Sequence, residues 1–165
     1  MSFRIGGKEL RRWGVNLVLV DPVTAPRGAE LLIALEWKGE ESIALAPWAG
    51  VLKFVRCEAD EQGLDANLLR EGKLEVRPRK GGEKIKLYRL RPSRNLKHLF
   101  QAVRVPSFER SKLPLVWLND RLVYAAGLGT DVRMYADPVL SPERVRLVWV
   151  PDKPLLALGP AEDDL

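Results

Sequence analysis

The stretch EVRPRKGGEKIKLYRL, residues 75–90, contains six lysines and arginines, two adjacent glycines and only two glutamates. On both sides of the glycines, apolar and charged residues alternate with the period of two that is typical of a half-buried β-strand. Adjacent glycines suit a tight reversal, because glycine accepts a positive φ without a Cβ clash. We therefore predict a β-hairpin that turns at Gly81 and Gly82 and has an outward face formed by Arg77, Arg79, Lys84 and Lys86.

The positive charge of the chain is concentrated around this stretch. The net charge is +5, but the segment from Arg77 to Lys112 carries twelve lysines and arginines and two glutamates, or +10, and the remaining residues carry −5. Repulsion within such a segment disfavours the compact state unless solvent or a polyanion offsets it. The segment is therefore either a solvated face or a patch directed at an anion.

The residues after the predicted hairpin indicate a helix. In SRNLKHLFQAVRVP, residues 93–106, Ser93 is placed to act as the N-cap, and Pro106 ends the segment. Four apolar residues at spacing i, i+3, i+4 and i+7 form one stripe, namely Leu96, Leu99, Phe100 and Val103. Another side of the helix carries Arg94, Lys97, Gln101 and Arg104, so that hairpin and helix each present a basic surface.

The rest of the chain indicates short strands. We predict strands over residues 16–20, 42–46, 50–57 and 146–150, and a second hairpin that turns at Asn119 and Asp120. Residues 29–37 fit a helix by composition and a strand by length, and the sequence leaves both open. Together these elements predict an α+β fold of short antiparallel strands and hairpins, with one amphipathic helix packed on the C-terminal sheet.

We divide the chain into three parts. Residues 1–70 are expected to be a smaller, mostly β linking segment, residues 71–151 a C-terminal domain, and residues 152–165 an acidic flexible tail. No stretch reaches the roughly 18 consecutive apolar residues of a membrane helix. The first residues lack the apolar core of a secretory signal, so we expect a cytoplasmic protein without a membrane partner.

Catalytic chemistry has few residues to draw on. His98 is the only histidine and Cys57 the only cysteine, which argues against a metal site or a His-based catalytic triad. The glycines of IGGK, residues 5–8, and GLGTD, residues 127–131, lack the spacing of a phosphate-binding loop and are predicted to form ordinary turns. We expect no catalytic residue and no bound metal in this chain.

The ordered set VRPRKGGEKIKL, NLKHLFQAVRVPSFERSKLPLVW and LVYAAGLGTD, within Leu74 to Asp131, resembles the C-terminal domain of tRNA(Ile)-lysidine synthetase. In that family the pattern is R-x-R-x-G-G-E, a helix that begins with a leucine-lysine pair, V-P-x-W-x-R, a P-L strand and G-L-G. Phe108 stands where the family usually has tryptophan. The preceding half is similar to the segment that joins the catalytic domain to this module in some bacterial members.

The resemblance implies a function. Full-length members use ATP, with magnesium, to ligate lysine to the anticodon wobble cytidine of an isoleucine tRNA, and the C-terminal domain helps to hold the tRNA near its acceptor stem. The catalytic signature S-G-G-x-D-S is not found in these 165 residues. The resemblance therefore implies a non-catalytic part of an ATP-dependent ligase, with tRNA and the enzyme's own N-terminal catalytic domain as partners. A homodimer formed through an open strand edge is left open.

The resemblance and the charge pattern together predict the site. The motif carries over to Arg77, Arg79, Lys97 and Arg110 as RNA-binding residues, with Gly81 and Gly82 shaping the turn. Charge and predicted facing alone add Lys80, Lys84, Lys86, Arg94 and Arg104, and we expect all of these cations to converge on one surface. The alternative is a basic protein-interaction module that docks an acidic partner.

Overall fold

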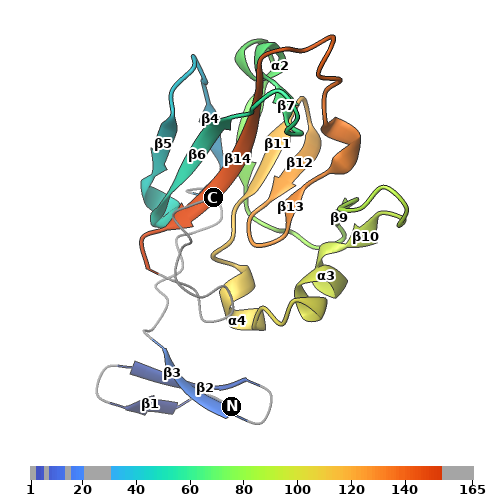
Figure 1. Ribbon diagram of the computed structural model, residues 1–165. Coiled ribbons are helices and arrows are strands. Elements are labelled where there is room, and N and C mark those ends of the chain that lie inside the picture. The colour runs from blue at the N-terminus through green and yellow to red at the C-terminus, as the bar shows by residue number, and fades with distance from the viewer. Residues whose placement is uncertain (1–2, 6–7, 14–15, 21–30, 154–165) are drawn as a thin grey trace.

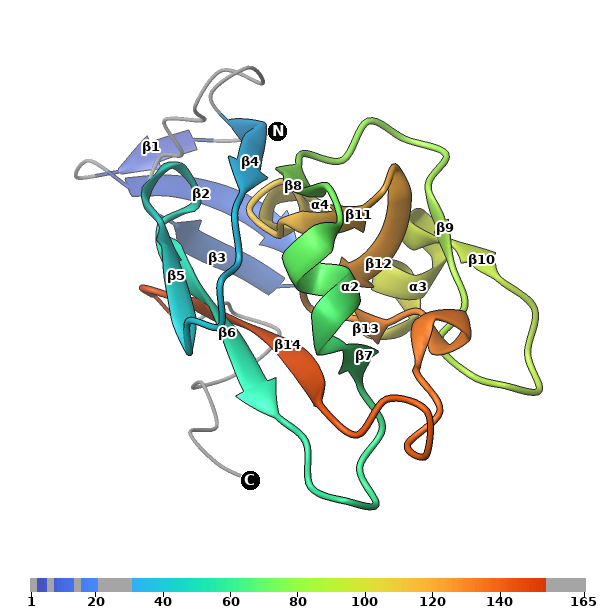
Figure 2. The ribbon, with the colours of Figure 1, turned by 90° about the horizontal axis from the view of Figure 1, so that it is seen from above.

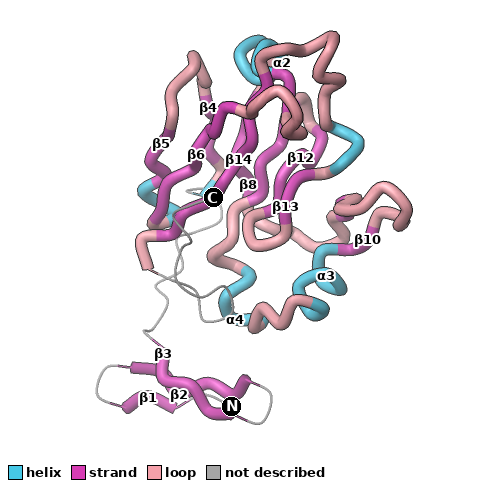
Figure 3. The backbone as a smooth tube through the Cα atoms, in the orientation of Figure 1, coloured by secondary structure: helices cyan, strands magenta, loops and turns pink. Residues whose placement is uncertain are grey.

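The computed structural model describes residues 3–5, 8–13, 16–20 and 31–153, and it describes side chains only within residues 31–153. It confirms the predicted α+β class, with short antiparallel strands and a few short helices (Figures 1 and 3). The first three ranges form an antiparallel sheet of β1 (Phe3–Ile5), β2 (Lys8–Trp13) and β3 (Asn16–Val20). The strand predicted over residues 16–20 is therefore confirmed.

A five-stranded sheet forms one layer of the remaining fold. Its strand order is β13-β12-β11-β8-β4 and every neighbouring pair is antiparallel. The strands are β4 (Ile33–Leu35), β8 (Leu74–Arg77), β11 (Leu115–Leu118), β12 (Arg121–Ala125) and β13 (Gly129–Thr130). The segment that the sequence left open between helix and strand thus contributes a strand at residues 33–35.

A four-stranded sheet, ordered β5-β6-β14-β7, forms the second layer. It consists of β5 (Ser42–Leu45), β6 (Gly50–Arg56), β7 (Leu64–Asp65) and β14 (Arg144–Pro151). Strands β6 and β14 are far apart in sequence but pair from Gly50↔Pro151 to Arg56↔Val145. Leu52 and Phe54 are buried, as the alternation in β6 predicts.

The two layers share one apolar core, and Figure 2 shows β6 and β14 crossing beside the strands of the other sheet. The backbone N–H of Trp149 in β14 donates a hydrogen bond of 3.0 Å to the hydroxyl of Tyr124 in β12. Burial of this hydroxyl raises the pKa of Tyr124 to about 12. Trp149 is itself buried, so its ring belongs to the core and not to a nucleic-acid surface.

The helices whose full extent the structure describes are short. They are α2 (Ala66–Glu71), α3 (Leu96–Ala102) and α4 (Ser107–Arg110), with 3₁₀ turns η1 (Ala46–Trp48) and η2 (Val132–Met134). Strands β9 (Lys84–Ile85) and β10 (Arg94–Asn95) form a separate antiparallel pair next to α3. Figures 1 and 2 both show this pair and α3 side by side, at the edge of the five-stranded sheet formed by β12 and β13.

The hairpin predicted at the two glycines is wrong. β8 pairs with β11 and β4 inside the five-stranded sheet, whereas the residues after the glycines pair with β10. The strand does end one residue before Pro78, which has no N–H to donate. The second predicted hairpin is confirmed, because β11 and β12 turn at Asn119 and Asp120, whose φ angles are +50° and +64°.

Two details of the predicted helix also differ. Asn95, not Ser93, is the N-cap of α3, and its side chain accepts a hydrogen bond from the Lys97 amide. The pairing of β10 with β9 keeps Arg94 and Asn95 extended, so the helix begins only at Leu96. Val103 lies beyond the helix and is 49% exposed, so it does not continue the apolar stripe.

The boundary expected at residue 70 stays a prediction, but strands from both sides of it share sheets. β4 borders β8, and β5, β6 and β7 lie in the same sheet as β14. Of the acidic tail expected over residues 152–165, residues 154–165 lie outside the described residues.

Candidate nucleic-acid interface

The two glycines sit in a loop that is closed by a carboxylate. In this glycine loop, residues 80–83, the Glu83 side chain accepts hydrogen bonds from the amides of Lys80, at 2.7 Å, and Gly81, at 2.8 Å. Gly81 and Gly82 have φ angles of +109° and +84°, and a Cβ at either would meet no atom within 4 Å. The loop therefore requires glycine for its backbone conformation and not for space.

Four exposed cations surround the glycine loop. Its end is tied to α3 by a hydrogen bond of 3.0 Å from the Leu96 amide to the Glu83 carbonyl, and β9 pairs with β10 directly before the helix. These contacts gather the loop, the strand pair and the first turn of α3. We call the exposed side chains that they bring together the cationic cluster: Lys80, Lys84, Arg94 and Lys97.

The cationic cluster surrounds its support and does not lie on one flat face. Paired residues share a face of a strand pair, so Lys84 lies on the side of Asn95 and Arg94 on the side of Ile85. Within the described residues, none of the four forms an ion pair with a carboxylate. Within residues 31–153 the charge of these four side chains is therefore not paired.

Arg79 and Arg110 form a second group, against α3. The Arg79 guanidinium carbon lies 5.8 Å from the centre of the Phe100 ring, and its buried Nη1 atom has no hydrogen-bond partner in the structure. The Arg110 Nε donates to the Val105 carbonyl at 3.0 Å. Burial, and then the charge of Arg79, lower the pKa of Arg110. Two guanidiniums thus share a half-buried site between α3 and α4.

Arg77 is engaged with carboxylates. Its Nη2 lies 2.9 Å from Glu75 and 2.6 Å from Asp120, and its guanidinium stacks 4.7 Å from the Trp117 ring centre. Hydrogen bonds from Arg77, followed by those from Lys73, lower the pKa of Glu75. Arg77 therefore contributes to a polar row on the five-stranded sheet, and it is not part of the cationic cluster.

Lys86 and Arg104 also stand apart. Lys86 is half-buried, and its backbone amide donates to the carboxylate of the buried Asp131 at 3.2 Å. Arg104 follows α3 with a φ of +60°, at the end away from the glycine loop, about 10 Å along a seven-residue helix. The expected single surface is thus only partly assembled. Four cations gather at the glycine loop, two lie behind α3, and Arg77, Lys86 and Arg104 are elsewhere.

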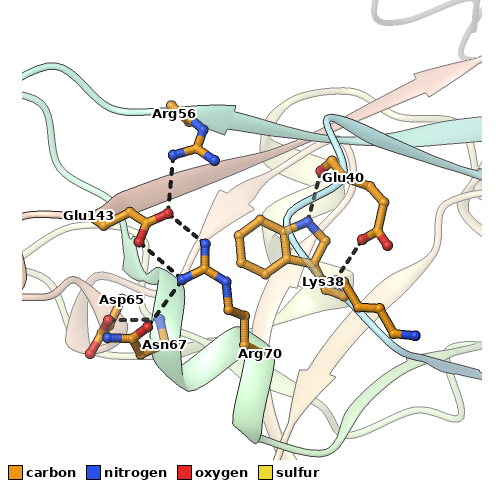
Figure 4. A network of polar contacts seen from close by, with 8 residues as sticks. Lys38, Glu40, Arg56, Asp65, Asn67, Arg70 and Glu143 are labelled. Atoms are coloured by element: carbon orange, nitrogen blue, oxygen red, sulfur yellow. Dashed lines mark hydrogen bonds and ion pairs between the residues drawn. The ribbon is translucent and has the colours of Figure 1, made fainter.

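Other arginines outside the predicted site are neutralised. Figure 4 shows the Arg70 guanidinium between Asn67 and Glu143, with Arg56 on the same carboxylate. Arg70 Nη2 lies 2.6 Å from Glu143 Oε1, and its guanidinium stacks on the Trp37 ring at 5.2 Å. Hydrogen bonds from Arg70 lower the pKa of Glu143, against a smaller effect of burial. This network joins α2, β6 and the start of β14.

Sequence reasoning missed three features of the site. Glu83 closes the glycine loop, and its place in the R-x-R-x-G-G-E pattern was the available signal. The buried Asp131 anchors the segment after β9, although no local pattern pairs it with Lys86. The basic residues of the turn after Leu87 were counted in the charge but not assigned to the site.

Metal or nucleophile chemistry finds little support in the part of the chain that is described. No three His, Cys, Asp or Glu side chains of residues 31–153 gather as metal ligands. His98 is exposed, and the Cys57 thiol donates to the Gln62 carbonyl at 3.5 Å. None of the helices in the described ranges combines the length and apolar character needed to cross a bilayer.

Comparison with known proteins identifies this arrangement. Residues 74–149 match the family model described as the TilS substrate C-terminal domain. This segment belongs to that family. The match begins at β8 and ends in β14, so the TilS C-terminal domain contains the glycine loop, the cationic cluster, Arg79 and Arg110.

The chain is also similar to curated proteins named tRNA(Ile)-lysidine synthase. The chain is 41% identical over 91 residues to the tRNA(Ile)-lysidine synthase of Ralstonia nicotianae, covering 55% of this chain and 19% of the relative. It is 33% identical over 113 residues to that of Nitrosomonas europaea, covering 68% and 24%. It is 32% identical over 142 residues to that of Xanthomonas campestris strain 8004, covering 86% and 29%. The chain thus spans less than a third of the length of these relatives.

Proposed function

We propose that this chain is the tRNA-binding C-terminal portion of a tRNA(Ile)-lysidine synthase and that it acts in the cytoplasm. In this proposal the full-length enzyme ligates lysine to an isoleucine tRNA with ATP, and the chain holds the tRNA on its acceptor-stem side. Its protein partner is the enzyme's own catalytic domain. The observation that supports the proposal is the cationic cluster, four exposed positive side chains on the glycine loop, the β9–β10 pair and the first turn of α3.

The cluster matches what an RNA stem offers. An A-form stem presents phosphates, 2′-hydroxyls and shape, while its deep, narrow major groove hides the bases from side chains. Recognition of such a stem requires cations at fixed positions and no base-reading pocket. Lys80, Lys84, Arg94 and Lys97 meet this requirement, because the Glu83 hydrogen bonds and the β9–β10 pair fix their backbones. Arg79 and Arg110 add positive charge behind the cluster.

ATP and magnesium do not fit the glycine turns of this domain. A phosphate-binding loop needs outward-pointing amides, but the Lys80 and Gly81 amides already donate to Glu83. In the second glycine turn, the Leu128 amide donates to the Ala125 carbonyl and the Asp131 amide to the Val123 carbonyl. We therefore assign ATP to the catalytic part of the enzyme and no cofactor and no catalytic residue to this chain.

Charge reversal within the cluster tests the proposal. In the double variant Lys84→Glu and Lys97→Glu, we expect tRNA affinity of the 165-residue chain to fall at least tenfold. The slope of log affinity against log salt is negative, and each lost phosphate contact should reduce its magnitude by roughly 0.7 to 0.9. Two lost contacts should therefore make the slope shallower by about 1.5. Fluorescence anisotropy with labelled tRNA over a salt series measures both quantities.

The matched control reverses two exposed cations that lie away from the cluster, Arg104→Glu and Arg121→Glu. It changes the net charge equally, so we expect a much smaller loss of affinity and an almost unchanged slope. Equal losses in both double variants would reject a localised site. Wild-type affinity in the cluster variant would favour the alternative, in which the basic surface docks an acidic protein. Arg77 is a poor probe, because Arg77→Glu would place a third carboxylate beside Glu75 and Asp120.

A further inference from the structure

The segment between β9 and β10 projects an apolar and aromatic tip from a fixed base. In this tyrosine loop, residues 87–93, the Arg91 amide donates to the Tyr88 carbonyl at 3.2 Å and closes a turn with Arg89 and Leu90 at its centre. The two ends of the loop are joined by the β9–β10 pair. Just before the loop, the Lys86 amide donates to Asp131 and the Lys86 carbonyl accepts from Val132 at 2.8 Å.

The side chains at the tip contribute little to the core. Tyr88 is 57% exposed and Leu90 is 99% exposed, although both could gain free energy from burial. The Arg91 guanidinium lies 5.0 Å from the centre of the Tyr88 ring, and Arg89 and Arg91 are both exposed. Proteins that bind single-stranded nucleic acids present exposed aromatic rings among cations, and the bases stack on those rings.

We propose that Tyr88 is a stacking platform for an unpaired nucleotide next to the RNA stem that the cationic cluster holds. This inference rests on the proposed RNA-binding function and adds the class of nucleotide that is recognised. Arg94 belongs both to the cationic cluster and to the strand that ends the tyrosine loop. A strand of RNA that leaves a stem bound at the cluster therefore meets the ring of Tyr88 within the same small unit.

An unpaired base is favoured over the alternatives by charge and shape. Bases within an A-form stem are stacked on one another, so an aromatic ring gains a partner only where a base is unpaired. Arg89, Arg91 and Arg94 give the tip the sign that a polyanion requires. Stacking does not depend on base identity, because every base has a π-face, so the site is expected to tolerate any nucleotide.

Two RNAs test the inference with the 165-residue chain. One is a blunt RNA duplex of two strands, and the other is the same duplex with four unpaired nucleotides at one 3′ end, the first of them 2-aminopurine. We expect Tyr88→Ala to weaken binding of the extended RNA about tenfold, the range expected for one lost stack, and to leave the blunt RNA unchanged. Tyr88→Phe should keep both affinities, because the ring remains.

Fluorescence of 2-aminopurine gives a direct readout, and its quenching should occur with the wild type and Tyr88→Phe but not with Tyr88→Ala. Leu140→Ala is the matched control, since Leu140 is an apolar side chain that is 82% exposed on another loop. An equal loss on both RNAs, or no loss on either, would overturn the stacking inference. Such a result would leave the proposed function intact as long as Lys84→Glu with Lys97→Glu still weakens binding of both RNAs at least tenfold.

Discussion

Asp131 is a fully buried carboxylate next to the site, with 1% of its side chain exposed to solvent. It accepts hydrogen bonds from the Arg133 guanidinium, at 3.0 and 2.7 Å, and from the backbone amides of Arg133 and Lys86. Burial alone would raise the pKa of Asp131, but these hydrogen bonds together outweigh burial and lower it. The charged carboxylate is thus the form that holds η2 against the strand leading into the tyrosine loop.

We expect Asp131→Asn to lower the free energy of unfolding at pH 7 by about 2 kcal/mol. The substitution replaces one accepting carboxylate oxygen with an NH₂ group, which would face the N–H groups of Arg133 or Lys86. The pKa of Asp131 is lower in the folded state, so its contribution is complete above the unfolded value near 4 and is lost as the pH falls through the folded pKa. Urea denaturation of both proteins at pH 7 and pH 3 measures this. The difference in the free energy of unfolding between the two proteins should be smaller at pH 3 than at pH 7. A larger difference at pH 3 would contradict a stabilising role of the charged carboxylate.

Some residues of the site could be identified from the sequence and some could not. The identity of the exposed cations followed from charge alone, but the choice between Ser93 and Asn95 as N-cap did not, because both side chains can accept the capping hydrogen bond. What decides it is the pairing of Arg94 with Ile85, a contact set by the tertiary fold. Likewise, nothing in the local pattern of Arg77 reveals that Asp120, 43 residues away, neutralises it.

At the scale of elements, the glycine loop and α2 offer two glycines that are required for different reasons. Gly82 has a φ of +84° and open space around it, whereas Gly72 has an ordinary φ of −82°. A Cβ on Gly72 would lie 2.6 Å from the Leu118 side chain and 2.6 Å from the Leu68 carbonyl oxygen. The first position resists substitution through backbone strain and the second through steric overlap.

We expect Gly82→Ala to cost about 1 kcal/mol of stability, the cost of a left-handed conformation for alanine, and Gly82→Asn to cost less. Gly72→Ala should cost about 2 kcal/mol or more, because a backbone carbonyl cannot move aside as a flexible side chain can. The midpoints of urea denaturation rank the three variants. A Gly82→Ala variant less stable than Gly72→Ala would contradict this ranking, because it would show that backbone strain at Gly82 costs more than steric overlap at Gly72.

The error at the first hairpin has a physical cause. The period of two in residues 74–90 fixed which side chains share a face, and β8 is indeed a strand. Periodicity does not choose the partner strand, and here β11 and β4 bury β8 on both edges, which a two-stranded hairpin could not do. The turn at Asn119 and Asp120 was predictable because both residue types tolerate positive φ.

For the whole molecule, the sequence predicts where the positive charge is concentrated, but it does not predict which cations are paired with carboxylates. The excess between Arg77 and Lys112 is real, yet Arg77 is paired with Glu75 and Asp120, while outside this segment Arg56 and Arg70 share Glu143. The Glu83 carboxylate in the glycine loop accepts from backbone amides, and no ion pair joins a side chain of the cationic cluster to a carboxylate within the described residues. Long-range pairing of strands decides this, and a single sequence does not state it.

The same long-range pairing bears on the division at residue 70. A fragment of residues 71–165 keeps the whole matched family segment, but it loses β4 from one edge of β8 and β6 from nearly the whole length of β14. Leu52 and Phe54 of β6 belong to the same apolar core as Trp149, so removal of β6 would expose Trp149. We therefore expect this fragment to show no cooperative urea transition by tryptophan fluorescence, while the 165-residue chain shows one.

Complementation makes this prediction specific to strand pairing. Added residues 1–70 supply β4, β5 and β6, so mixing the two fragments should restore a cooperative transition and the binding of labelled tRNA measured by fluorescence anisotropy. A matched peptide with Leu52→Asp and Phe54→Asp places two carboxylates at buried positions and should restore neither. If residues 71–165 unfold cooperatively alone with the stability of the whole chain, the boundary at residue 70 separates two independent units, and the β6–β14 pairing contributes little to the stability of the domain.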